Sequence, residues 1–68
     1  MSVYRVLEVI GTSEKSFEHA AQVAIETASG SLKDLRVAEV TKFDVTIEKG
    51  KIKMYRARIN LSFKYHND

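Results

Sequence analysis

Cysteine, proline and tryptophan are all absent from the 68 residues of this chain. Without cysteine the chain has no disulfide and no thiolate metal site. A chain of this length makes a single domain, residues 1–68, and buries only about 60% of the surface that it exposes when unfolded. Small domains without disulfides are usually stabilised by self-association, so we expect an oligomer.

Long apolar runs are also absent, because no stretch approaches the roughly 18 residues that span a bilayer. The first residues lack the apolar segment of a secretory signal, so we expect a cytoplasmic protein without a membrane partner. The net charge is only +2. A charge this small does not indicate a nucleic-acid partner.

The first half of the chain has the pattern of a strand followed by a helix. Residues 3–10 alternate as a strand does, but both faces are mostly apolar, which indicates that a second subunit covers one of them. The next segment has helical spacing with a narrow, alanine-rich apolar face. We expect Thr12 or Ser13 to cap the start of the helix and Gly30 to end it in the left-handed conformation.

The second half has the pattern of two long strands. Residues 35–48 favour extended structure, with an irregularity over residues 40–44 that is typical of a bulge. Residues 48–51 form a turn in which Gly50 takes a positive φ. Residues 52–65 give the clearest alternation of apolar and polar side chains in the chain. The order is β-α-β-β, and we predict an α+β fold in which a three-stranded antiparallel sheet wraps around one helix.

Catalytic patterns are weak in this sequence. The two histidines, His19 and His66, have no spacing that brings a nucleophile and an orienting acid to them, so we expect no enzyme. Basic residues are frequent late in the chain but lack the interleaved aromatic residues of a nucleic-acid stripe. Carboxylates such as Glu39, Asp44 and Glu48 are the oxygen ligands that hard cations prefer.

Three ordered segments of the chain resemble the dodecins, which are small β-α-β-β proteins that assemble as hollow dodecamers of cubic symmetry. They are "YRVLEVIGTSEKSFEHAAQVAI", "LRVAEV" and "KMYRARINLSFKY". The resemblance implies a homododecamer that stores or sequesters a ligand. In typical dodecins the ligand is a flavin, whose rings stack on tryptophans of symmetry-related subunits while a glutamine hydrogen-bonds the ring edge.

This chain departs from that pattern at both positions. The resemblance places Val37 where the tryptophan stands and Arg56 where the glutamine stands. Valine offers no π face, and the loss of one aromatic stack costs roughly 1–3 kcal/mol. Arginine has no acceptor, so its charge favours an anionic group or a carboxylate of a neighbouring subunit. We therefore expect a dodecin shell that is deficient in normal flavin binding.

Two alternatives follow for the ligand. One is a divalent cation such as calcium, held near subunit boundaries by oxygen ligands; the candidate residues are Asp44, Glu8 and Glu39. The other is weak flavin binding in an apolar slot around Val37. In each case the expected partners are other copies of the chain and a small ligand or cation, with no nucleic acid and no membrane.

Overall fold

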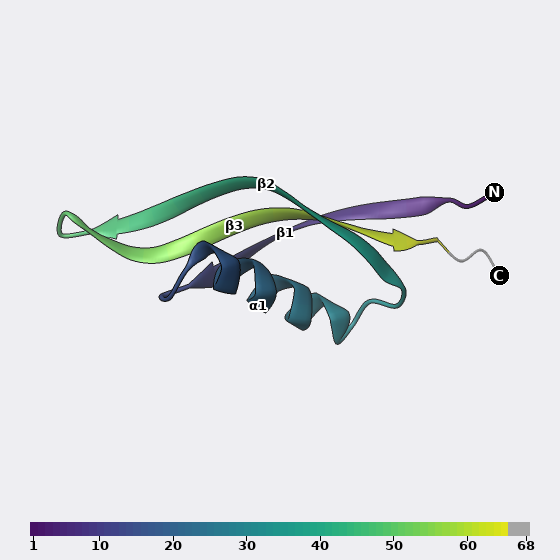
Figure 1. Cartoon of the computed structure of the whole chain (residues 1–68), viewed down its shortest axis with the longest axis horizontal. Helices are drawn as coiled ribbons and strands as arrows, with labels where there is room; N and C mark the ends of the chain where they lie inside the picture. Colours follow the sequence, from purple (N-terminus) through teal and green to yellow (C-terminus); the bar gives the residue numbers. More distant parts are fainter. Residues whose placement is uncertain (66–68) are drawn as a thin grey trace.

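A computed structural model describes residues 1–65 and contains three strands and one helix. Strand β1 (Tyr4–Ser13) is followed by helix α1 (Phe17–Ser29), strand β2 (Leu35–Glu48) and strand β3 (Lys51–Lys64). The predicted β-α-β-β order is confirmed, and Figure 1 shows the helix lying along one side of the long strands. His66 lies outside the described residues. Within residues 1–65, no helix is long and apolar enough to cross a bilayer.

The sheet is antiparallel with the order β1-β3-β2, so the last strand is central. The alternation of β3 reflects a strand with one face packed on the core and the other face away from it. Its apolar residues Ala57, Ile59 and Leu61 are buried against the helix. The alternate residues of β3, which are mostly polar, lie on the other face of the sheet, and we call this the helix-free face.

Strand β1 is longer than its apolar pattern indicated, and the helix consequently begins later. Gly11 pairs with Ala57 and Ser13 with Tyr55, so the strand continues three residues beyond the predicted end at residue 10. The helix is capped by Ser16, whose Oγ accepts a hydrogen bond from the backbone N–H of His19 at 3.0 Å. The expectation that Thr12 or Ser13 provides the cap was wrong, because pairing with β3 holds both residues in the strand.

The end of the helix also differs from the expectation. Gly30 has φ −70°, which is right-handed, because the chain continues for another turn in which the N–H groups of Ser31 and Leu32 donate to the carbonyl of Ala28. The left-handed residue before β2 is Asp34, with φ 58°. Aspartate adopts this conformation more readily than most residues, which is why a pattern based on glycine missed it.

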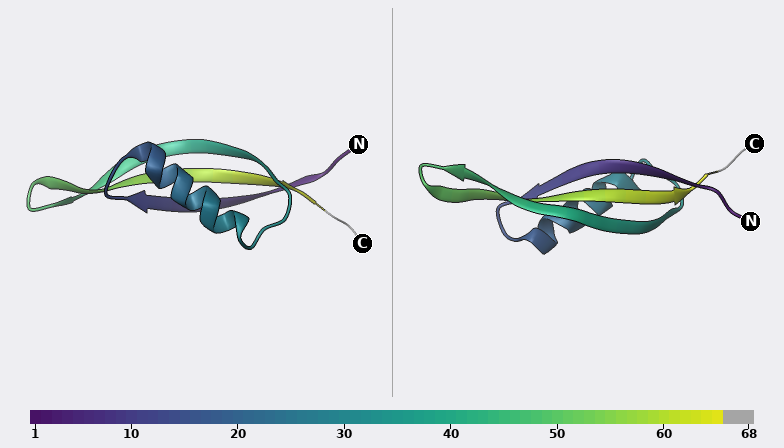
Figure 2. Two further views of the ribbon diagram at one scale, coloured as in Figure 1. Left: turned by 60° about the horizontal axis from the view of Figure 1, so that its bottom comes forward. Right: turned by 90° about the horizontal axis from the view of Figure 1, so that it is seen from above.

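The long β2–β3 hairpin is irregular along β2 and regular at its turn. The register shifts between Val40 and Lys42, which confirms the bulge expected over residues 40–44. Lys49 and Gly50 make a two-residue turn with φ 53° and 74°. Two positive φ values match the twist of the flanking strands, so this tight turn follows directly from the local sequence. Figure 2 shows the hairpin extending beyond both β1 and the helix.

Candidate functional site

All five predicted site residues lie on the helix-free face of the sheet. Residues directly opposite each other in an antiparallel sheet share a face. Glu8 and Glu39 both lie opposite Asn60, Asp44 lies opposite Arg56, and Val37 lies opposite Ser62. Asn60, Arg56 and Ser62 alternate along β3 on the face away from buried Ile59 and Leu61. The register therefore brings together residues that are up to 48 positions apart in the sequence.

Asp44 and Arg56 form a two-pronged ion pair across β2 and β3. Arg56 Nε donates to Asp44 Oδ1 at 2.6 Å and Nη2 donates to Oδ2 at 3.1 Å. The hydrogen bond from Arg56 lowers the pKa of Asp44, and the positive charges of Arg58 and Lys42 act in the same direction. The pKa of Arg56 is raised by the same hydrogen bond. The anionic partner of Arg56 is thus a carboxylate of its own chain, and the charges of the two groups are already matched.

A second row of side chains crosses the same face and has one carboxylate on each side of a central amide. Glu8 on β1 and Glu39 on β2 flank Asn60 on the central strand, and both glutamates are exposed. Their Cα atoms are two strand spacings apart, about 10 Å. Within residues 1–65, no group of three or more Asp, Glu, His or Cys side chains could hold a metal ion. Two carboxylates about 10 Å apart with one amide between them do not by themselves make a calcium site, which takes six to eight oxygen ligands.

Asn60 is a residue of this row that the sequence analysis did not single out. Its position was visible, because the alternation of β3 placed it on the polar face. What the sequence did not contain was the pairing of this residue with Glu8 on one side and Glu39 on the other. That pairing depends on the register of two separate strand contacts.

Val37 lies in a neighbouring row that has no aromatic side chain. Val6, Ser62 and Val37 succeed one another across the sheet, and the exposed fraction of Val37 is 58%. The rings of Phe17, Phe43 and Tyr55 form a separate cluster that packs the start of α1 against the sheet. The ring centroid of Phe17 lies 4.8 Å from that of Phe43 and 5.0 Å from that of Tyr55. The row around Val37 offers apolar contact but no π face for a flat ligand.

The side chains of Ser13 and His19 are joined by a hydrogen bond where β1 leads into α1. Ser13 Oγ lies 2.6 Å from His19 Nδ1 and also accepts the backbone N–H of Lys15 at 2.9 Å. The hydroxyl is held on both sides, and Ser13 is only 4% exposed. A nucleophile must reach its substrate, and this one is enclosed. The pair fixes the turn from β1 into α1.

The fold and this face of the sheet define a small β-α-β-β protein that presents a charged and apolar surface away from its helix. The Dodecin family model matches residues 3–66, and the chain belongs to that family. The chain is 46% identical over 65 residues to the calcium dodecin of Mycobacterium tuberculosis, covering 94% of this chain and 90% of that protein.

Solved structures of dodecins also have the fold of this chain. The crystal structure of the Mycobacterium tuberculosis calcium dodecin, described as calcium chelating with a novel calcium-binding site, has a TM-score of 0.84 and 44% identity, over 96% of this chain and 93% of that one. The Streptomyces coelicolor dodecin has a TM-score of 0.93 and 33% identity, over 98% and 96% of the two chains. The predicted family and fold are therefore confirmed.

Proposed function

We propose that this dodecin forms a homo-oligomeric shell, a dodecamer as the family resemblance implies, that binds calcium or a similar divalent cation and does not hold flavin by ring stacking. In this proposal it is a cytoplasmic binding and storage protein and not an enzyme. The observation that carries the proposal is the row formed by Glu8, Asn60 and Glu39, which places carboxylate and amide oxygens on an exposed face.

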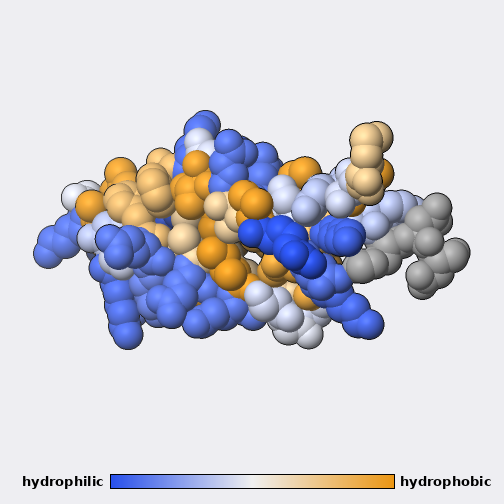
Figure 3. Space-filling model, turned by 45° about the vertical axis from the view of Figure 1, so that its right-hand side comes forward, coloured by the Kyte–Doolittle hydropathy of each residue, from blue (hydrophilic) through white to orange (hydrophobic). Residues whose placement is uncertain are grey.

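The shape of a single protomer supports self-assembly. Its accessible surface is 5255 Å², whereas a compact monomer of 7.7 kDa exposes about 4,300 Å². The excess of roughly 900 Å² is close to what one partner buries in a standard interface. Large apolar side chains make up part of this surface, and on the helix-free face they include Tyr4, Val6, Ile10 and Val37. Figure 3 shows apolar side chains reaching the surface in a band across the middle of the molecule.

The cation is supported by the chemistry of the row. Calcium takes six to eight oxygen ligands at about 2.3–2.6 Å, often from several carboxylates. One protomer supplies two glutamates and an amide on one face, so a second protomer that covers this face would complete the shell. Asp44 remains a candidate ligand, but Arg56 already holds both of its oxygens. The 46% identity to a protein named calcium dodecin makes calcium the first cation to test.

The absence of a stacking ring supports the second part of the proposal. Val37 leaves no π surface in its row, and Arg56 is engaged by Asp44. Weak flavin binding is retained as the second candidate, because Val37 and Ala38 line a small cavity of about 220 Å³ whose other walls include Leu61 and the helix residues Ile25 and Ser29. Quenching of flavin fluorescence on titration with the protein would favour this candidate.

Native mass spectrometry of the purified protein, before and after chelation, tests the assembly and the cation together. We expect an oligomer that loses mass on chelation and regains it with calcium.

Calorimetry of the chelated protein then tests the site. Replacing Glu8→Gln or Glu39→Gln removes a charged ligand, and we expect calcium binding to weaken about tenfold or more. The matched control is Glu48→Gln, because Glu48 lies at the hairpin and is bonded to Lys53 at 2.7 Å. Equal affinity in all three variants would contradict the assignment of this row.

A further inference from the structure

The tip of the β2–β3 hairpin, residues 46–54, projects from the rest of the protomer (Figure 1, far end from the termini). Strand β1 pairs with β3 only as far as Tyr55, so within residues 1–65 the tip is a ribbon of two strands. Ile47 lies directly opposite Ile52, and their exposed fractions are 69% and 56%. Isolated two-stranded hairpins are marginally stable in water, and an exposed isoleucine pair adds to that cost.

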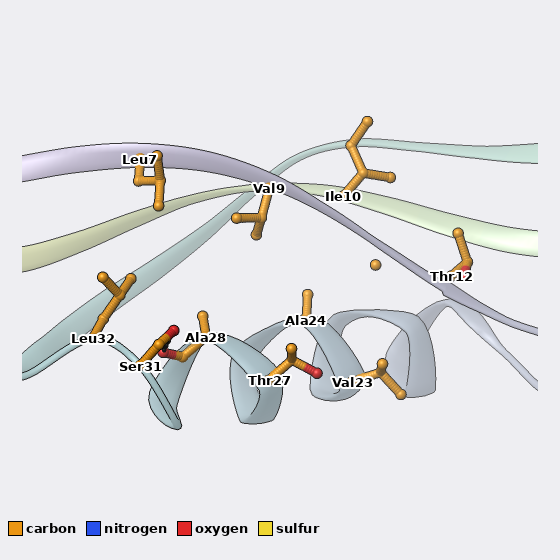
Figure 4. A pocket seen from close by; sticks show the side chains of 11 residues that line it. Leu7, Val9, Ile10, Thr12, Val23, Ala24, Thr27, Ala28, Ser31 and Leu32 are labelled. Carbon is orange, nitrogen blue, oxygen red and sulfur yellow. Dashed lines mark hydrogen bonds between the residues drawn. The ribbon is translucent and has the colours of Figure 1, made fainter.

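An apolar groove lies between β1 and α1 in the same protomer. Figure 4 shows Leu7 and Val9 of β1 on one side, and Ala24, Ala28 and Leu32 on the other. Its volume is about 330 Å³, and Val23 and Thr27 form the outer wall on the helix. The groove exists because α1 crosses the sheet diagonally (Figure 2), and its alanines are too short to fill the space that opens toward its end.

We propose that the tip of one protomer inserts Ile47 and Ile52 into the groove of a second copy of the chain. The two-residue turn fixes the conformation of the hairpin tip, and the apolar groove has room for the side chains of Ile47 and Ile52. The charges are complementary: the tip carries Lys49, Lys51 and Lys53 against one carboxylate, Glu48. Helix α1 contains two glutamates and no lysine or arginine. Glu26 lies three residues from Val23, which makes it a neighbour of the groove wall.

The contact is between copies, because the tip does not reach its own groove. Val9 in the groove lies opposite Ile59, seven residues along β3 from Ile52. Seven residues of strand span about 23 Å. A tip that binds the groove of the next copy makes a head-to-tail interface, which closes into a ring when the rotation from one copy to the next allows it. This inference rests on the self-assembly proposed above and names two of the surfaces that join.

Engineered cysteines test the contact directly, since the chain has no native cysteine. The test variant carries Ile52→Cys in the tip and Thr27→Cys in the groove wall. The matched control carries Ile52→Cys and Gln22→Cys, because Gln22 is also exposed on α1 but does not line the groove. Facing thiols in an assembly meet at an effective concentration near millimolar, so we expect the test pair to cross-link under mild oxidation about tenfold faster than the control.

The products separate the possible outcomes. Cross-linked dimers and larger species on a denaturing gel, enriched in the test variant, would support the docking of the tip. An intact oligomer in which both pairs react at the same slow rate would overturn this contact and leave the proposed assembly standing. A wild-type protein that is monomeric at all concentrations would overturn both. Charge reversal gives an independent check: Lys51→Glu should weaken the oligomer, and adding Glu26→Lys should restore it.

Discussion

Gly11 lies on β1 directly beneath α1, and its replacement by alanine tests how closely the helix and the sheet are packed. A Cβ at this position would overlap the carbonyl oxygen of Ala20 and lie 2.8 Å from Ala24 Cβ. Neither obstacle is the end of a flexible side chain, because one belongs to the helix backbone and the other is attached to it. The added methyl group can be accommodated only by moving α1 away from the sheet.

The expected cost follows from overpacking in a rigid core. Inserting a methyl group into a packed core typically costs about 1–3 kcal/mol. Because the helix must move as a unit and Ala20 is fully buried against the sheet, we place Gly11→Ala at the upper end, about 3 kcal/mol. The lower chain entropy of alanine in the unfolded state offsets roughly 0.4–1 kcal/mol of this. For a chain of this size the net effect lowers Tm by roughly 10–20 °C.

Thermal unfolding followed by circular dichroism measures the shift, at equal protein concentration because the Tm of an oligomer depends on concentration. The control is Gly30→Ala. Gly30 has φ −70°, and a Cβ there would meet only the Thr27 carbonyl at 3.4 Å. We expect this change to be neutral or to stabilise by up to about 1 kcal/mol. A Gly11→Ala protein that melts with the wild type and the control would refute the close packing of α1 on β1.

Three further changes test other parts of the structure. Because Arg56 lowers the pKa of Asp44 below its ordinary 3.8, the ion pair stabilises the fold above that pH and is lost on acidification through the lowered value; Asp44→Asn should flatten the acid limb of a stability–pH curve, and an unchanged limb would argue against the pair. Gly50 has φ 74°, so Gly50→Ala should cost about 1–2 kcal/mol in urea unfolding through backbone strain alone, and an unchanged midpoint would contradict the turn geometry. Val37→Trp places an aromatic ring on the helix-free face and should tighten flavin binding about tenfold or more in fluorescence titrations; equal affinities would show that an aromatic ring at residue 37 does not control flavin binding.

The sequence analysis proposed the candidate site residues, with Val37 and Arg56 taken from the family resemblance, but it did not give their partners across the sheet. The sequence named Val37, Arg56, Asp44, Glu8 and Glu39, and alternation indicated which residues of β3 share a face. The structure adds that Asp44 faces Arg56 and that both glutamates flank Asn60. Partners across a sheet depend on register, and a slip of one residue would send every side chain to the opposite face. No pattern within a single strand contains that information.

The sequence by itself determined the elements whose signals are local. The alternation of β3, the alanine-rich face of α1 and the turn at Gly50 each depend on neighbours within a few residues. Only the tertiary structure decided where β1 ends, that Ser16 caps the helix, and that Gly30 is right-handed, because pairing with β3 extends one element and displaces the next. The same packing leaves a hairpin tip without support at one end and an apolar groove beside the helix. The unsupported tip arises because β1 is shorter than the β2–β3 hairpin, and the groove arises from the way α1 crosses the sheet; both depend on the folded chain.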